Sequence, residues 1–199
     1  MTASQRDLTA LIGSRICHDL ISPLGAIGNG VELLAMSGTV AGPEMSLIAE
    51  SVDNANARIR FFRIAFGACS AGQMTPRREI TKIITDLTRG GRTSINWDAD
   101  GDLPRQEVKL AFLLLQCFET AMPWGGDVTV SREDNAWTIT GEAKRMKLDP
   151  ALWEVLSNPN ASHEVAASEV HFALAPLEAD GLKRSLAVEA EELKATISF

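Results

Sequence analysis

Two long runs of apolar residues at helical spacing open the chain. In the first, from about Ser4 to Met36, apolar side chains recur every three or four residues and form one stripe. A short turn separates it from a second run, from about Pro43 to Gly72. The matching stripe of that run consists of Met45, Ile48, Val52, Ala55, Ile59, Phe62 and Phe66. We therefore predict an antiparallel helical hairpin. Because a lone hairpin leaves both stripes uncovered, we expect two copies to pack as a four-helix bundle in a homodimer.

The pattern changes after a polar break at residues 73–78, where we place a domain boundary. Helical periodicity predicts helices at 79–88, 104–122, 150–157 and 165–180, the last interrupted near Pro176. Alternation predicts strands at 94–98, 127–132, 136–141, 185–190 and 193–199. The fold class is therefore α+β. Residues 1–74 form the helical hairpin, and residues 79–199 form a sandwich of one mixed or antiparallel sheet covered by helices.

The first helix carries the candidate chemistry. His18 lies two residues from both Ile16 and Leu20, so at about 100° per residue its imidazole points away from the apolar stripe, into water. Asp19 follows directly and can orient the ring or help to deprotonate it. Pro23 removes a helical hydrogen bond and costs about 3 kcal/mol, a load that a purely structural helix does not need. The face around His18 holds mostly short side chains: Ser14, Arg15, Ser22 and Gly25.

The string HDLISPL, His18 to Leu24, resembles the H-box of sensor histidine kinases, His-Glu/Asp-Leu-x-x-Pro-Leu. The longer string from Ser14 to Leu34 is more similar to the ChpT-type histidine phosphotransferases, dimeric phosphorelay proteins of alphaproteobacteria that take part in cell-cycle regulation. This resemblance implies that His18 is the nucleophile that accepts a phosphoryl group and that Asp19 is its orienter or base. It also implies receiver domains of response regulators as partners, with that of a hybrid kinase as donor. The residues expected to contact a receiver are Arg15, Ile21, Ser22 and Gly25.

The second half resembles the ATP-binding (Bergerat) domain of histidine kinases in its order of elements, but its nucleotide boxes are missing. The Asn-x-x-x-Asn box has Gln116 and Thr120 at its two positions. Residues 141–144, GEAK, stand where an Asp-x-Gly-x-Gly box is expected, and residues 171–181 contain no glycine-rich phosphate loop. We therefore expect no bound ATP and no metal site, with Mg²⁺ supplied by the receiver domain.

Three alternatives stay open on the sequence. The chain could be an ATP-dependent kinase core with divergent boxes, or a non-catalytic dimeric scaffold for response regulators. It could also be an aspartyl-phosphate phosphatase in which Ser22 positions water. Mg-ATP binding, phosphoryl exchange that depends on His18, and release of inorganic phosphate distinguish these activities.

Composition excludes several other classes. The net charge is −7 and no long basic run occurs, which argues against nucleic acid as a partner. Cys17, Cys69 and Cys117 show no ligand spacing and indicate reduced thiols in a cytoplasmic protein. The first residues lack a signal-peptide pattern, and the longest strongly apolar run, residues 110–115, is too short to cross a membrane. His163 and His171 show no triad pattern, and no G-x-S-x-G elbow is present.

Overall fold

The computed structural model describes residues 43–67, 69, 70 and 72–199, together with residues 12, 15, 16, 19, 20, 23, 25–27, 29, 30 and 33 of the amino-terminal segment. Each described residue between 12 and 33 has helical backbone conformation. His18, Ile21, Ser22 and Cys17 lie outside the described residues. The predicted hairpin and the dimeric bundle therefore stay predictions.

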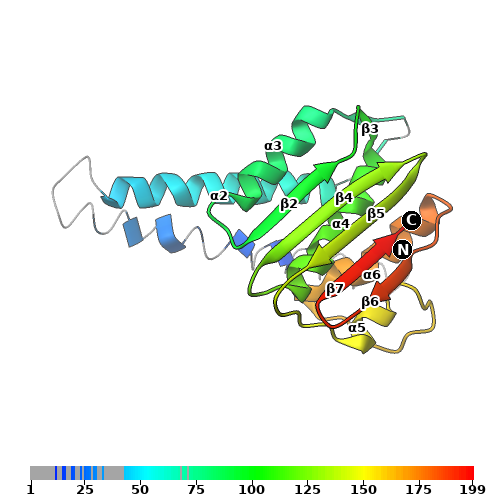
Figure 1. Ribbon diagram of the computed structural model, residues 1–199. Helices are drawn as coiled ribbons and strands as arrows, with labels where there is room; N and C mark the ends of the chain where they lie inside the picture. Colours follow the sequence, from blue (N-terminus) through cyan, green and yellow to red (C-terminus); the bar gives the residue numbers. More distant parts are fainter. Residues whose placement is uncertain are drawn as a thin grey trace.

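The second predicted helix is present as α2, Pro43–Ala65. Its predicted end at Gly72 is wrong. The last helical hydrogen bond runs from the Phe66 amide to the Phe62 carbonyl at 2.8 Å. The chain then bends at Gly67, where a Cβ atom would lie 2.1 Å from the Arg63 carbonyl oxygen. Glycine thus lets the backbone leave the helix at this point. The amino-terminal part of α2 projects beyond the sheet (Figure 1).

A five-stranded mixed sheet forms the centre of the second half, as predicted. Its order is β2 (Thr93–Asp98), β4 (Gly126–Glu133), β5 (Ala136–Glu142), β7 (Lys194–Ser198) and β6 (Ala187–Ala190). Strands β2 and β4 are parallel, and the other neighbours are antiparallel. Asp134 and Asn135 have positive φ angles of 45° and 72° in the tight β4–β5 turn, a conformation that these two residue types tolerate. A separate pair joins β1 (Met74–Thr75) to β3 (Leu103–Pro104).

Helices α3, α4 and α6 lie on one face of this sheet (Figure 1). Their bounds, with those of the shorter helices, are α3 Arg77–Thr88, α4 Arg105–Ala121, α5 Pro150–Glu154, the 3₁₀ helix η1 Ala167–Glu169 and α6 Val170–Gly181. The predicted interruption at Pro176 is wrong, because α6 runs through it. Burial of Phe172, Ala175 and Ala179 in the core offsets the hydrogen bond that proline removes. Helix α5 is shorter than predicted and is capped by Asp149, whose carboxylate accepts hydrogen bonds from two amides of its first turn.

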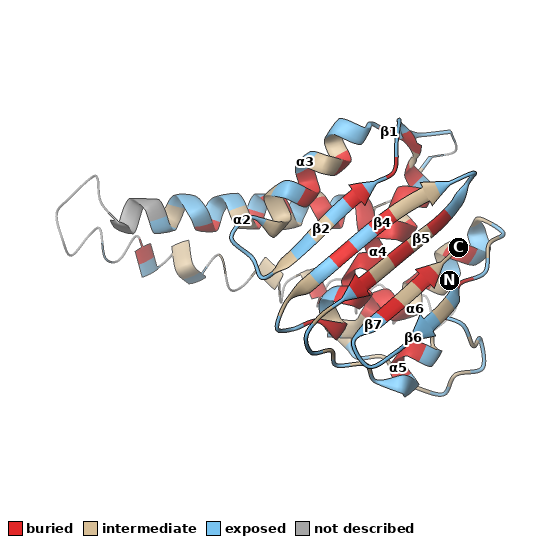
Figure 2. Ribbon diagram, in the orientation of Figure 1, coloured by how far each residue is buried: buried red, intermediate tan, exposed pale blue. Residues whose placement is uncertain are grey.

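One hydrophobic core includes side chains from both α2 and the sheet half. Phe61 of α2 stacks on Phe112 of α4, with ring centroids 4.6 Å apart and planes 9° apart. Figure 2 shows the buried residues of α2 gathered toward its carboxyl end, where the helix meets α3 and α4. The core is therefore continuous across the predicted boundary between residues 74 and 79. The boundary itself stays a prediction.

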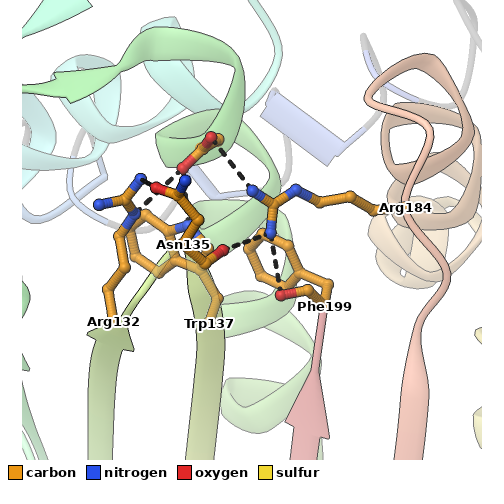
Figure 3. Close-up of polar contacts among 6 residues, drawn as sticks. Arg132, Asn135, Trp137, Arg184 and Phe199 are labelled. Carbon is orange, nitrogen blue, oxygen red and sulfur yellow. Dashed lines mark hydrogen bonds and ion pairs between the residues drawn. The ribbon is translucent and has the colours of Figure 1, made fainter.

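A buried carboxylate ties the end of the chain to α4. Glu107 accepts a 2.8 Å hydrogen bond from the Trp137 indole and ion pairs from Arg132 at 3.2 Å and Arg184 at 3.3 Å. Arg184 also donates to the carbonyl oxygen of Phe199 at 3.1 Å. Figure 3 shows Arg132 and Arg184 approaching this cluster from opposite sides, with the Phe199 ring behind Trp137. Four segments far apart in sequence are thus held at one point.

Among the helices that the structure describes, none is both long enough and apolar enough to cross a bilayer.

Candidate functional site

Asp19 is the described residue closest in sequence to His18, and two arginines surround it. Its Oδ2 lies 2.8 Å from Nη2 of Arg15, one helical turn earlier, and 3.6 Å from Nη1 of Arg58 on α2. The Asp19 side chain is only 8% exposed, so both charges act on it with limited screening by water. Its predicted contact with the His18 ring stays a prediction, since His18 lies outside the described residues.

Arg15, predicted to contact a receiver, is 9% exposed and engaged within the chain. Besides its ion pair with Asp19, its Nη1 donates to the Ser168 carbonyl oxygen at 3.1 Å. That bond joins the amino-terminal helical segment to η1 of the second half. A role of Arg15 in receiver binding stays a prediction, but the observed contacts hold its guanidinium against the protein itself.

Gly25 lies at an open surface, and its predicted contact with a partner stays a prediction. It is exposed, and apart from its chain neighbours and its own helix backbone, no atom of the described residues lies within 4 Å of the position that a Cβ would occupy. A hollow of about 480 Å³ lies on this part of the molecule, and Asp19, Pro23 and Arg58 contribute to its walls. The α3–β2 turn, residues 89–91, closes its far side. Ile21 and Ser22, the other predicted contact residues, lie outside the described part of the chain.

At the position of the first nucleotide box, Gln116 is buried and Thr120 is half-buried. Gln116 is 1% exposed, and its amide has no hydrogen-bond partner among the described residues. Thr120, one turn later, forms a 3.1 Å hydrogen bond with Nε2 of His171 on α6. His171 is fully buried, and its pKa is lowered from 6.5 to about 3, mainly by desolvation and secondarily by the positive charge of Arg15. Its ring is therefore neutral and serves as a core residue that spans α4 and α6.

Aromatic rings fill the space next to this contact. Trp153 of α5 packs edge-on against Phe118 of α4 at 5.7 Å and against Phe172 of α6 at 5.9 Å. A Cβ at Gly141 would lie 2.4 Å from the Phe118 ring, so the end of β5 also packs directly on this aromatic group. The three segments that carry nucleotide ligands in the resembled kinase domain thus meet here through packed side chains.

The described thiols show no arrangement suited to catalysis. Cys69 and Cys117 are free. Burial raises the pKa of the Cys117 thiol well above its usual value, which keeps it protonated and unreactive. Within the part of the chain that the structure describes, no three His, Cys, Asp or Glu side chains gather as metal ligands would. The H-box histidine, His18, stays the predicted reactive group.

Comparison with known proteins adds independent information. Residues 77–194 match the family model of the histidine phosphotransferase C-terminal domain. The chain is 36% identical over 201 residues to the protein phosphotransferase ChpT of Brucella abortus (strain 2308), covering 97% of this chain and 96% of the relative. It also superposes on a solved bacterial phosphotransferase with a TM-score of 0.83 and 33% identity, over 100% of this chain and 98% of the other.

The chain belongs to the histidine phosphotransferase family. It is a phosphorelay histidine phosphotransferase of two-component signalling, as the H-box string had predicted. The sequence analysis named Arg15 but missed that Arg58 meets Asp19 and that Arg15 reaches Ser168, because these contacts join distant segments. Arg58 lies on α2, and Ser168 is 153 residues away from Arg15. An arginine on a helix gives no local signal of which carboxylate it will meet.

Proposed function

We propose that the protein shuttles a phosphoryl group between aspartates of receiver domains through a phosphohistidine at His18, without binding ATP. The observation that carries this proposal is the family assignment combined with an H-box whose aspartate is fixed by two guanidiniums. Response-regulator receivers, among them the receiver of a hybrid kinase, act as donor and acceptor. The phosphotransferase named ChpT covers nearly the whole chain, which supports the same kind of partner here.

The transfer needs little chemistry from the protein. A nitrogen of the neutral His18 ring attacks the phosphorus of an aspartyl phosphate. As the P–N bond forms, the P–O bond to the receiver's aspartate breaks, and the carboxylate leaves with the electron pair. The opposite ring nitrogen keeps its proton and needs an acceptor to orient it, a role that we assign to Asp19. The second half-reaction reverses these steps on another receiver, whose own site supplies the Mg²⁺.

Absence of ATP binding is supported by the side chains at the position of the first nucleotide box and by the aromatic rings beside them. Asparagine ligands for phosphate and Mg²⁺ are replaced by a buried Gln116 and by a Thr120 that is bonded to His171. Trp153, Phe118 and Phe172 pack together beside them. A nucleotide would have to displace these core rings, which would expose apolar surface to water.

A homodimer is supported by apolar side chains that the single chain leaves exposed. Val52 and Ile59 are 38% and 48% exposed, and they lie seven residues apart on one face of α2. Leu47 on α2 and Leu33 on the amino-terminal segment are exposed as well. A second hairpin packed along this face of α2 would cover these side chains.

The central test uses a receiver domain that carries a radiolabelled phosphoryl group. Label should pass to the wild-type protein with no nucleotide present, and His18→Ala should take none. His163→Ala is the matched control, because it removes a histidine from a loop outside the H-box and should accept label at the wild-type rate. Label on His18→Ala would refute the phosphohistidine. Labelling of the wild type by Mg-ATP without a receiver would instead support the kinase alternative.

A further inference from the structure

Arg58 of α2 bridges two carboxylates that come from different parts of the chain. Its Nη1 lies 3.6 Å from Oδ2 of Asp19, the residue that follows His18. Its Nη2 lies 3.2 Å from Oε1 of Glu119, in the last turn of α4. A single planar guanidinium uses separate nitrogens for the two partners. The H-box turn is thereby connected through one side chain to the core helix of the second half.

The two arms of this bridge differ in their exposure to water. The Asp19 side chain is 8% exposed, whereas those of Arg58 and Glu119 are 32% and 44% exposed. The outer pair is screened by solvent and adds little net stability. The inner carboxylate is shielded, and Arg15 holds it from the other side while also bonding to Ser168. The two arginines that pair with Asp19, Arg15 and Arg58, each also contact the sheet half, and Arg58 contributes position rather than stability.

We propose that Arg58 is a positioning residue for phosphoryl transfer at His18. It holds Asp19, the residue that directly follows His18 in the sequence, at a fixed place against α4. Residues 18 and 19 share one peptide bond, so a displacement of Asp19 moves the neighbouring imidazole. In-line transfer between a ring nitrogen and phosphorus is sensitive to shifts on the order of 1 Å. This inference rests on the proposed function, and its test separates the two.

Two hollows border Arg58 and give its side chain room to respond to substitution. One is the hollow beside Asp19, and the other, also of about 480 Å³, lies between α2, α4 and the edge strand β2. Arg58 contributes to the walls of both. A shorter or uncharged side chain at this position therefore leaves the core packing intact and removes only the bridge. That makes Arg58 suitable for a substitution that tests positioning without unfolding the protein.

The experiment compares Arg58→Gln with Arg60→Gln in single-turnover transfer from a labelled receiver. Arg60 is the matched control because it also lies on α2, is 37% exposed and forms a 3.3 Å ion pair with a carboxylate, that of Asp86. Lys82 and Arg89 still pair with Asp86 after the control substitution. For Arg58→Gln we expect the rate constant at saturating receiver to fall roughly 10- to 100-fold, with half-saturating concentration and melting temperature unchanged. Arg60→Gln should match the wild type in all three.

Arg58→Lys supplies a rescue test, because a lysine keeps the positive charge next to Asp19 but cannot reach both carboxylates with a planar fork. It should recover part of the lost rate constant. A wild-type rate constant in Arg58→Gln would overturn the inference, as would a loss confined to the half-saturating concentration, which would make Arg58 a receiver contact. If the wild type itself takes no label, the proposed function fails. If the wild type takes label and the Arg58 variants transfer it at the wild-type rate, the inference fails and the proposed function stands.

Discussion

A single buried histidine gives the sheet half a specific dependence on pH. His171 is fully buried between α4 and α6, and Thr120 is the hydrogen-bond partner of its Nε2. Its pKa is about 3 in the folded protein, because burial disfavours the charged ring and Arg15 adds repulsion. In the unfolded chain the pKa is 6.5. The unfolded state therefore binds more protons whenever the pH lies between these values.

This difference predicts how the free energy of unfolding changes with pH. The contribution of His171 is complete above pH 6.5 and is lost progressively as the pH falls toward 3. Between pH 7 and pH 5 it amounts to about 2 kcal/mol. In His171→Leu, the loss of unfolding free energy between these two pH values should be smaller by about that amount. Denaturant titrations at the two pH values measure it, and an equal loss in both proteins would contradict the assignment.

The candidate site could be predicted from sequence only where its information is local. The H-box string is contiguous, so His18 and Asp19 were identified from their neighbours. The environment of Asp19 was not, because Arg58 and Arg15 act through contacts that depend on the packing of α2 and η1. Arg15 is an example. Helical geometry places it on an exposed face, yet its guanidinium donates to the Ser168 carbonyl and the residue is buried.

At the scale of elements, α2 carries two apolar faces rather than one. The stripe seen in the sequence includes Val52 and Ile59, which are exposed in the single chain. A second group, Ala57, Phe61 and Ile64, is buried against the sheet half. The two groups point in different directions around the helix, so α2 can contact the sheet half and a second hairpin at the same time.

The exposed face of α2 predicts the effect of a charge in the proposed dimer interface. In Val52→Lys and Ile59→Lys, an ammonium group would replace apolar contacts between the two hairpins, and we expect monomers. Asp53→Lys is the control, since position 53 lies about 100° around the helix from Val52 and should leave the dimer intact. Light scattering after size exclusion measures the mass. A dimer that persists in both variants, or a monomeric wild type, would contradict the predicted bundle.

Short-range patterns explain which elements were predicted well. The β4–β5 hairpin was found because a polar turn separates two alternating strands, and the last hairpin was found for the same reason. Errors occurred where tertiary packing decides. Helix α6 continues through Pro176 because its buried face holds it on α4, and α2 ends at Ala65 because Gly67 permits a bend toward β1. Neither outcome can be read from periodicity alone.

At the scale of the whole molecule, the Glu107 cluster joins α4 to the β4–β5 hairpin, to the segment after α6 and to the carboxyl end. Glu107 is 8% exposed, and its carboxylate accepts hydrogen bonds from Arg132, Arg184 and the Trp137 indole. Arg184 also donates hydrogen bonds to the carbonyl oxygens of Asn135 at 2.6 Å and Phe199 at 3.1 Å. Side chains from these separate segments therefore meet in one cluster (Figure 3).

Removing the charge of Glu107 should therefore destabilise the fold. In Glu107→Gln, two partly buried guanidiniums lose their counter-charge, and we expect a loss of about 2 kcal/mol, or roughly 4–8 °C in melting temperature. Glu142→Gln makes the same substitution in an ion pair with Lys194 whose side chains are 59% and 49% exposed, and its melting temperature should stay almost unchanged. Thermal unfolding followed by circular dichroism tests both. Equal melting temperatures for the two variants would show that the cluster is not structural.

The position of α2 in the core also affects how the protein can be divided for study. The family match begins at residue 77, after α2 has ended. A fragment cut there would lack four side chains that help to form the core: Phe61, Phe62, Ile64 and Ala65. Phe112 would lose its stacked ring and face water. Expression of the carboxyl-terminal half for crystallography or titration should therefore keep α2 attached, because the shorter fragment would expose an apolar surface to water and tend to precipitate.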